Sequence, residues 1–273
     1  PKQKKAVFCG TGDSFVSAQL AEVFSGFRAR ACDPLDLLKN KRLAKDKDLY
    51  MISISGNTVS NIKLAKAVKN TVAVTAYKQS RLVNACKKLI LLQYPNSGIF
   101  TAGSISFLAS ALTCISLVSK IKIRNVSKLY KKADTQSRKI RLRGKVFLLG
   151  NMHTFPVAMF GAAKIYEAVG LDAHYERIEQ FSHMGLFSAK KGDTVIIFEE
   201  KNKYNSKLAS SLKKYGLNVV QLQPNTKNIQ ETVLFFIFVS ELIALYHAKK
   251  KNQKDCFFVT AKKLREASSS MIY

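Results

Sequence analysis

Two passages of the chain begin with the same pattern of apolar and polar positions. A short apolar run at residues 6–8 leads into CGTGDSF, and a second one at residues 145–149 leads into GNMHTFP. Apolar residues then recur at helical spacing over residues 15–24 and 157–169. Each half of the chain is therefore predicted to begin with a strand, a turn and a helix.

The alternation of strands and helices continues after each of these starts. Buried-type strands are predicted at residues 49–55, 71–76, 194–200 and 218–223, and amphipathic helices at residues 60–68 and 207–215. Strands that alternate with helices form right-handed βαβ units on a parallel sheet. Because the pattern occurs twice, we predict an α/β protein with two doubly wound parallel sheets, each a flavodoxin-like three-layer αβα domain.

The boundary between the two domains is predicted after a long apolar helix at residues 102–123. Residues 1–124 would form the first domain, residues 125–144 a basic connecting segment, and residues 145–273 the second domain with a C-terminal helical tail. Between Lys120 and Lys145 there are eleven Lys or Arg residues and one acidic residue.

This basic stretch is expected to be a solvated connecting helix rather than a nucleic-acid patch. Such patches interleave aromatic side chains for base stacking, whereas Tyr130 is the only aromatic residue between Phe107 and Phe147. Nucleic acid is therefore not expected as a partner.

Composition narrows the class of protein. The 273 residues are 47% apolar and 23% charged, an ordinary globular balance, with 45 Lys+Arg against 18 Asp+Glu and a net charge of +27. Such a field attracts anions, whether nucleic acid, acidic surfaces or phosphorylated metabolites, unless the lysines only decorate the surface. The longest apolar run, at residues 233–246, is shorter than the roughly twenty residues of a membrane span, so no membrane partner is expected.

The cysteines indicate a reducing compartment. Their number is odd (five), and no two form a CxxC pair, so neither disulfides nor a zinc site are expected. Residues 1–5 lead directly into a strand, so we expect no signal peptide and a cytoplasmic location. No metal or cofactor is predicted, and Cys9 is expected to be a buried thiol.

The first turn has the composition of an anion site. Gly10 and Gly12 permit tight backbone turns, and Ser14 would begin a helix whose hydroxyl and free N–H groups face outward. A second cluster of small donors, formed by Ser53, Ser55, Asn57 and Thr58, surrounds Gly56 at the end of the next strand. One such loop could be an ordinary helix cap, but two in successive βα units favour a phosphate site. Neither a P-loop nor a dinucleotide fingerprint is present.

The second half carries a different set of chemical groups. Pro156 suits the first turn of a helix and Gly170 its C-terminal cap, while Lys164 and Glu167, three residues apart, share one helix face. His183 follows in a predicted loop. By spacing alone, the lysine and glutamate would be a surface ion pair and the histidine a structural residue.

Four segments together resemble a known family. CGTGDSFVSA, SISGNT, GNMHTFPVAMFGAAKIYEA and IEQFSHMGL are similar to the tandem sugar-isomerase (SIS) domains, above all to the isomerase half of glucosamine-6-phosphate synthase and to related phosphosugar isomerases and deaminases. The resemblance covers nearly the whole chain.

The resemblance implies a role for each matching residue. Binding of the sugar 6-phosphate would fall to Ser14, Ser53, Ser55, Asn57 and Thr58, and contacts to the sugar to Gly10, Thr11 and Thr101. Glu167 would move the proton between C1 and C2, with Lys164 beside it. His183 would help to open the sugar ring and, as in relatives, would come from the neighbouring subunit, which implies a homodimer with shared sites.

The chain also departs from that family. Phe160 stands where a glutamate is expected, and the imine-forming lysine near the C-terminus has no clear match, with Lys262 and Lys263 the best placed. These 273 residues include no counterpart of the glutaminase half, so synthase activity is not expected. The expected function is aldose–ketose isomerisation of a hexose or hexosamine 6-phosphate, or deamination of an amino sugar; the alternative is a non-catalytic sensor of sugar phosphates.

Overall fold

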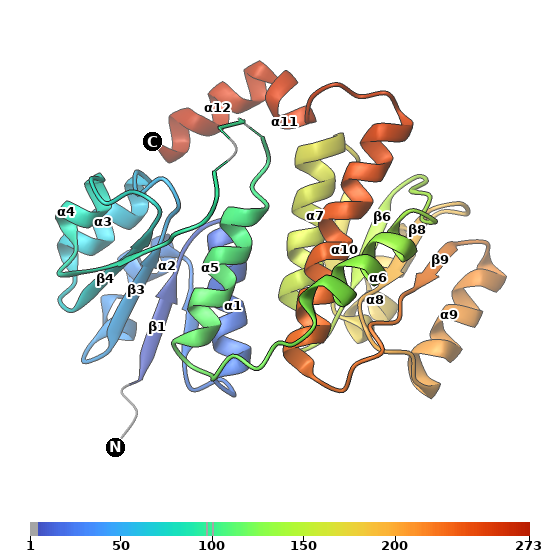
Figure 1. Ribbon diagram of the computed structural model, residues 1–273, viewed down its shortest axis with the longest axis horizontal. Helices are drawn as coiled ribbons and strands as arrows, with labels where there is room; N and C mark the ends of the chain where they lie inside the picture. The colour runs from blue at the N-terminus through green and yellow to red at the C-terminus, as the bar shows by residue number, and fades with distance from the viewer. Residues whose placement is uncertain (1–4, 97, 100) are drawn as a thin grey trace. The chain divides into compact units, whose positions relative to one another are not determined.

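The computed structural model describes residues 5–96, 98–99 and 101–273 (Figure 1). Its contacts divide the chain into two units: unit 1, residues 1–121 with 262–273, and unit 2, residues 122–261. Each unit holds one parallel sheet between two layers of helices. The predicted fold class is confirmed.

Unit 1 contains a five-stranded parallel sheet of order β2-β1-β3-β4-β5. The strands are β1 (Ala6–Cys9), β2 (Arg30–Cys32), β3 (Asp48–Ile52), β4 (Thr71–Thr75) and β5 (Lys88–Leu91). The helices are α1 (Asp13–Phe24), α2 (Pro34–Lys39), the 3-10 turn η1 (Lys41–Ala44), α3 (Val59–Ala67), α4 (Arg81–Ala85), α5 (Ile105–Ser116) and α12 (Lys262–Ile272).

Alternation along the strands of unit 1 divides its core into two layers. Val7 and Cys9 point to the face covered by α2, α3 and α4, whereas Phe8 points to the face covered by α1 and α5. The turns after β1 and β3 are therefore followed by helices on opposite faces of the sheet.

Unit 2 repeats this plan with one strand fewer, in the order β7-β6-β8-β9. The strands are β6 (Val146–Leu149), β7 (Ala173–Glu176), β8 (Thr194–Ile197) and β9 (Asn218–Gln221). The helices are α6 (Val126–Ser137), α7 (Phe155–Val169), α8 (Ile178–His183), the 3-10 turn η2 (Gly185–Ser188), α9 (Lys203–Tyr215), α10 (Ile229–Lys250) and α11 (Phe257–Thr260).

The two faces of this second sheet are also covered differently. Phe147 and Leu149 pack against α8 and α9, whereas Leu148 lies against α7, close to Gly161. As predicted, α7 has Pro156 in its first turn and ends at Gly170, which adopts the left-handed conformation at φ +69°.

The structure corrects three predicted boundaries. The apolar helix expected over residues 102–123 spans only Ile105–Ser116. Residues 125–144 are not a free connector, because α6 packs against α10 within unit 2. The C-terminal tail is divided: α11 contacts α7 of unit 2, whereas α12 is grouped with unit 1.

Helix α10 is long and apolar enough, by length and composition, to cross a membrane. Of its most apolar 18-residue window, however, 72% is buried inside the protein, where the helix contacts α7 and α6. This is the environment of a core helix.

Candidate active site

The turn between β1 and α1 is tightly folded around two glycines. A Cβ on Gly10 would lie 2.7 Å from the Ser14 Cβ, and Gly12 has a φ of +56°, so both positions favour glycine. The Ser14 N–H donates to the Thr11 carbonyl at 3.1 Å. The prediction of a free N–H at Ser14 is therefore wrong, although in the described part of the chain the hydroxyls of Thr11 and Ser14 have no hydrogen-bond partner.

An acidic side chain, overlooked in the sequence, begins the same helix. Asp13 is the first residue of α1, and its Oδ2 would lie 3.5 Å from a Cβ placed on Gly103. The carboxylate is thus turned toward the segment that precedes α5. Thr101 belongs to that segment and is exposed.

The polar residues of the turn between β3 and α3 form two separate hydrogen-bonded pairs. The Ser53 and Thr58 hydroxyls are 3.0 Å apart, form a hydrogen bond and are only 4% and 8% exposed. Ser55 Oγ accepts from the Asn57 N–H at 3.3 Å, and both residues are partly exposed. Ser53 and Thr58 hold the turn, which leaves Ser55, Asn57 and the first N–H groups of α3 for an anion.

The absence of a side chain at Gly56 lets this turn pack closely against the end of β4 and the residues that follow it. Its φ is +64°, and a Cβ there would lie 2.2 Å from Ser80 Oγ and 3.1 Å from Thr75 Oγ1. Since β1 and β3 are neighbours and their helices leave to opposite faces, both polar turns lie at the switch point of the unit 1 sheet, where α/β proteins bind ligands. The structure thus brings together the two predicted phosphate turns.

In unit 2, Lys164 and Glu167 form a hydrogen-bonded ion pair on the last turns of α7. Lys164 Nζ donates to Glu167 Oε2 at 2.5 Å and lies 5.0 Å from the centroid of the Phe160 ring. The lysine side chain is 4% exposed and the glutamate side chain 37%. A buried ammonium therefore orients a carboxylate that solvent and small molecules can reach.

His183 lies on the other side of the same sheet. It ends α8, which packs on the face opposite α7, and its side chain is 72% exposed. Its Nε2 is 3.4 Å from Glu179 Oε1. The pKa of Glu179 is lowered mainly by the hydrogen bond that Tyr204 donates to it, and to a smaller extent by the hydrogen bond with His183. The sheet separates His183 from Glu167 of the same chain.

Unit 2 has its own switch point, where the side chain of a glutamate accepts hydrogen bonds from the turn after β6. Glu199, two residues after β8, accepts hydrogen bonds through Oε1 from the Asn151 N–H at 2.9 Å and from Thr154 Oγ1 at 2.6 Å. A carboxylate of the chain itself thus occupies the place where unit 1 presents its hydroxyls. Glu199 is identified only by the structure, because its partners Asn151 and Thr154 come from a distant turn of the chain.

Two further predicted positions are located by the structure. Lys262 and Lys263 are exposed residues of the first turn of α12. Cys9 is fully buried, and burial raises the pKa of its thiol, as expected for a structural cysteine.

Comparison with known proteins finds similar structures but no similar sequences. No family model matches the sequence, and no curated protein sequence matches it. Solved structures, however, match most of the chain. Tagatose-6-phosphate ketose/aldose isomerase from Escherichia coli has a TM-score of 0.74 and 17% identity over 93% of this chain and 85% of its own. The fold is that of the SIS-domain phosphosugar isomerases.

Two more solved structures share this fold. Glucosamine-6-phosphate deaminase from Thermotoga maritima has a TM-score of 0.72 and 17% identity over 91% of this chain and 86% of that one. The C-terminal domain of glucosamine-fructose-6-phosphate aminotransferase from Francisella tularensis has a TM-score of 0.72 and 15% identity, over 93% and 86% respectively. Units 1 and 2 therefore share the fold of tandem SIS domains.

Proposed function

We propose that this chain, whose two units share the SIS fold, is a phosphosugar enzyme. It would interconvert the aldose and ketose forms of a hexose or hexosamine 6-phosphate. The observation that carries the proposal is the pair formed by the buried Lys164 and the accessible Glu167. A carboxylate held in one orientation by a fixed cation is suited to proton transfer between two adjacent carbons.

The chemistry assigned to Glu167 is a single proton shuttle. The carboxylate removes the proton from C2 of the open-chain aldose, the carbonyl oxygen at C1 gains a proton, and a cis-enediol forms. The proton returned to C1, with loss of the hydroxyl proton at C2, gives the ketose. The Lys164 ammonium orients the Glu167 carboxylate and stabilises the negative charge that develops on the enediol oxygens.

An amino sugar follows the same route with one more step. With nitrogen at C2, the proton transfer gives a C2 imine in place of the ketone. Addition of water to that imine releases ammonia and leaves the keto sugar phosphate. The same pair of residues therefore supports isomerase and deaminase chemistry, and the substituent at C2 decides the product.

The polar turns of unit 1 are proposed to hold the phosphate. Ser14, Ser55, Asn57 and the N–H groups at the start of α3 offer donors at a switch point, and hydrogen bonds to a charged group contribute about 1.5–3 kcal/mol each. Ser53 and Thr58 would act by holding the turn in shape, because their hydroxyls already bond to each other.

We also propose that the active enzyme is a homodimer. Glu167 and His183 lie on helices that cover opposite faces of one sheet, which supports two separate sites for Glu167 and His183 of one chain. If His183 opens the sugar ring, a second subunit must supply it.

An assay of glucosamine 6-phosphate and fructose 6-phosphate, each followed for isomerisation and for ammonia release, tests the proposal. Turnover by the wild type should fall at least about 100-fold in Glu167→Gln. Glu200→Gln, an exposed carboxylate of unit 2 that lies outside the pair, is the matched control and should keep its activity. A wild type that turns over neither sugar, but whose melting temperature rises with one of them, would favour the sensor.

A further inference from the structure

The sheet of unit 2 lacks the strand that completes the sheet of unit 1. In unit 1, β5 pairs in parallel with β4 from Val72↔Lys88 to Thr75↔Leu91. In unit 2, β9 holds the position of β4, and no described strand pairs with its outer edge. The place of a fifth strand is open.

The backbone of β9 presents unpaired groups at this edge. The Asn218 N–H donates to the Asp193 carbonyl, so Asn218 and Val220 face β8, and the alternate residues Val219 and Gln221 turn their N–H and C=O groups outward. Among the described residues, no hydrogen bond to these outward groups is found.

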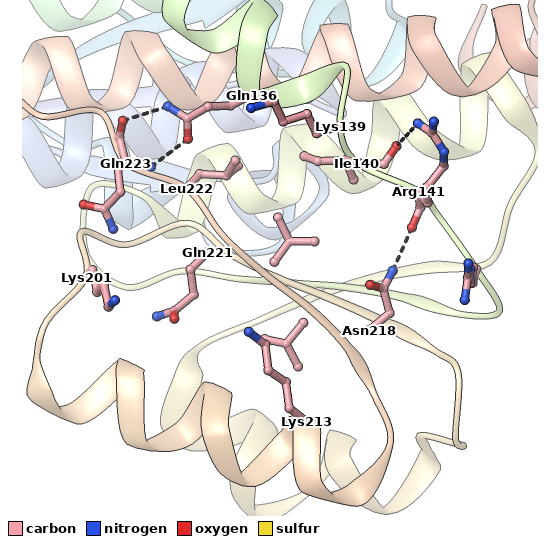
Figure 2. A pocket seen from close by; sticks show the side chains of 13 residues that line it. Gln136, Lys139, Ile140, Arg141, Lys201, Lys213, Asn218, Gln221, Leu222 and Gln223 are labelled. Carbon is pink, nitrogen blue, oxygen red and sulfur yellow. Dashed lines mark hydrogen bonds between the residues drawn. The ribbon is translucent and has the colours of Figure 1, made fainter.

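One side chain already pairs with this edge in the manner of a strand. The Gln136 amide donates to the Gln223 carbonyl at 3.0 Å and accepts from the Gln223 N–H at 3.0 Å (Figure 2). The primary amide thereby reproduces the pairing that a neighbouring peptide group would give. It closes one end of the edge and leaves Val219 and Gln221 uncovered.

The edge forms the floor of a groove of about 630 Å³ between the segment 136–143 and α9 (Figure 2). Five cationic side chains line the groove: Lys139, Arg141, Arg143, Lys201 and Lys213. Its lining contains neither a carboxylate nor an aromatic ring, and none of the five cations forms an ion pair with a described residue.

The wall of the groove is held in place from behind. Lys250 donates to the carbonyls of Arg138 and Ile140, and Arg138 binds Asp134 at 2.9 Å while its guanidinium lies over the Tyr246 ring. The segment 136–143 therefore stands as a preformed side of the groove rather than a loose loop.

We propose that this groove binds an extended, acidic segment of another polypeptide, which adds to β9 as the missing fifth strand. The outward groups of Val219 and Gln221 would pair with the backbone of that segment, and the five cations would select carboxylates on its side chains. The function proposed above does not require this site.

Two other occupants fit the groove less well. A second copy of this chain would place its own strongly basic edge against the first one, and the two edges would repel each other. Single-stranded nucleic acid binds through stacking on aromatic rings, which the groove lacks, and its backbone does not match the alternating donors and acceptors of a strand edge.

Binding of a fluorescent ten-residue peptide of alternating Glu and Val to the full chain tests the proposal by anisotropy. The same peptide with alternate backbone nitrogens methylated keeps every charge but cannot form the ladder, and should bind at least about 10-fold more weakly. A Lys–Val peptide and a ten-nucleotide single strand serve as charge and polymer controls. Equal binding of the methylated and unmethylated acidic peptides, or tighter binding of the oligonucleotide, would overturn the proposal.

Variants of the chain locate the site. The double variant Lys139→Glu/Lys213→Glu should weaken binding of the acidic peptide by about 10-fold or more. The control Lys207→Glu/Lys254→Glu makes the same change of charge elsewhere on unit 2 and should alter the affinity less than about 2-fold. Val219→Pro removes one outward N–H from an edge strand and should weaken binding without loss of charge. If the two charge variants behave alike, or if no peptide binds, the cations only protect the edge from aggregation and the proposal fails.

Discussion

The Lys164 side chain is only 4% exposed, yet its ammonium lies 2.5 Å from a carboxylate oxygen of Glu167, whose side chain is 37% exposed. Removal of one partner from a fully buried ion pair costs about 3–5 kcal/mol, because the remaining charge is left uncompensated. In Lys164→Met the remaining Glu167 carboxylate is accessible to solvent, so we expect the free energy of unfolding to fall by less than about 3 kcal/mol, measured by urea denaturation. Turnover should fall about 100-fold, because the carboxylate loses its orienting cation. A variant that unfolds readily but keeps its kcat would contradict this role.

The turn around Gly56 tolerates no side chain, whereas Gly26 offers a matched control. Both have φ near +60°, but a Cβ at Gly26 meets nothing within 4 Å. Gly26→Ala should cost about 1 kcal/mol from backbone strain alone. Gly56→Ala should cost more and should abolish the thermal shift given by a sugar phosphate, because the clash with Ser80 deforms the turn. Ser80→Gly in the same chain should restore part of both losses; equal costs at the two glycines would refute this account.

Glu199 is predicted to be structural rather than catalytic. In Glu199→Ala the Asn151 N–H and the Thr154 hydroxyl lose this acceptor, but the N–H still donates to Thr154 Oγ1 and the hydroxyl to the Asn151 carbonyl, so the cost should be about 0.5–1.5 kcal/mol. Glu199→Gln keeps an acceptor oxygen and should lose less. Glu200→Ala, at the exposed neighbouring position, should stay within about 0.5 kcal/mol of wild type. Chemical denaturation of the three variants separates these outcomes, and a Glu200 effect as large as that of Glu199 would count against it.

Two carboxylates beside α8 should respond to pH in opposite directions. Burial raises the pKa of Glu176 above its unfolded value, so its stabilising contribution is present at low pH and is lost as pH rises through the folded pKa. Glu176→Gln should therefore gain stability relative to wild type between about pH 4 and pH 7.

Glu179 has a lowered pKa, so its contribution is present above the unfolded pKa and is lost as pH falls through the folded one. Glu179→Gln should accordingly lose stability relative to wild type as pH rises from about 2 to about 5, with a constant difference above that range. Melting curves from about pH 2 to about pH 7 give both differences, and parallel trends in the two variants would exclude the assigned environments.

The sequence was sufficient to predict the layers of the fold, because buried parallel strands such as β4 and β8 consist of apolar residues and threonine without a charge. It did not predict β2 or β5, which lie at the edges of the sheet and carry Arg30 and Lys88. Nor did it place α6 in unit 2, since its buried residues Leu129 and Ala133 are few among many lysines. An edge strand or a sparsely apolar helix gives too weak a pattern.

The candidate site was predicted by residue type but not by interaction. Motif spacing identified both turns of unit 1, yet it could not show that Ser53 and Thr58 bond to each other. Glu199 was missed for a similar reason: a glutamate after a strand is common, and its partners Asn151 and Thr154 lie more than forty residues away in the chain. Contacts between distant turns depend on the sheet that aligns them.

The burial of α10 between two other helices has a consequence for how the chain is made. Both of its partners, α6 and α7, precede it in the sequence, so they have already left the ribosome when α10 emerges. The most apolar stretch of the chain can therefore dock as soon as it is synthesised. A chain shortened from its N-terminal side past residue 169 would produce the same helix with nothing to cover it, and would be prone to capture by chaperones or to precipitation.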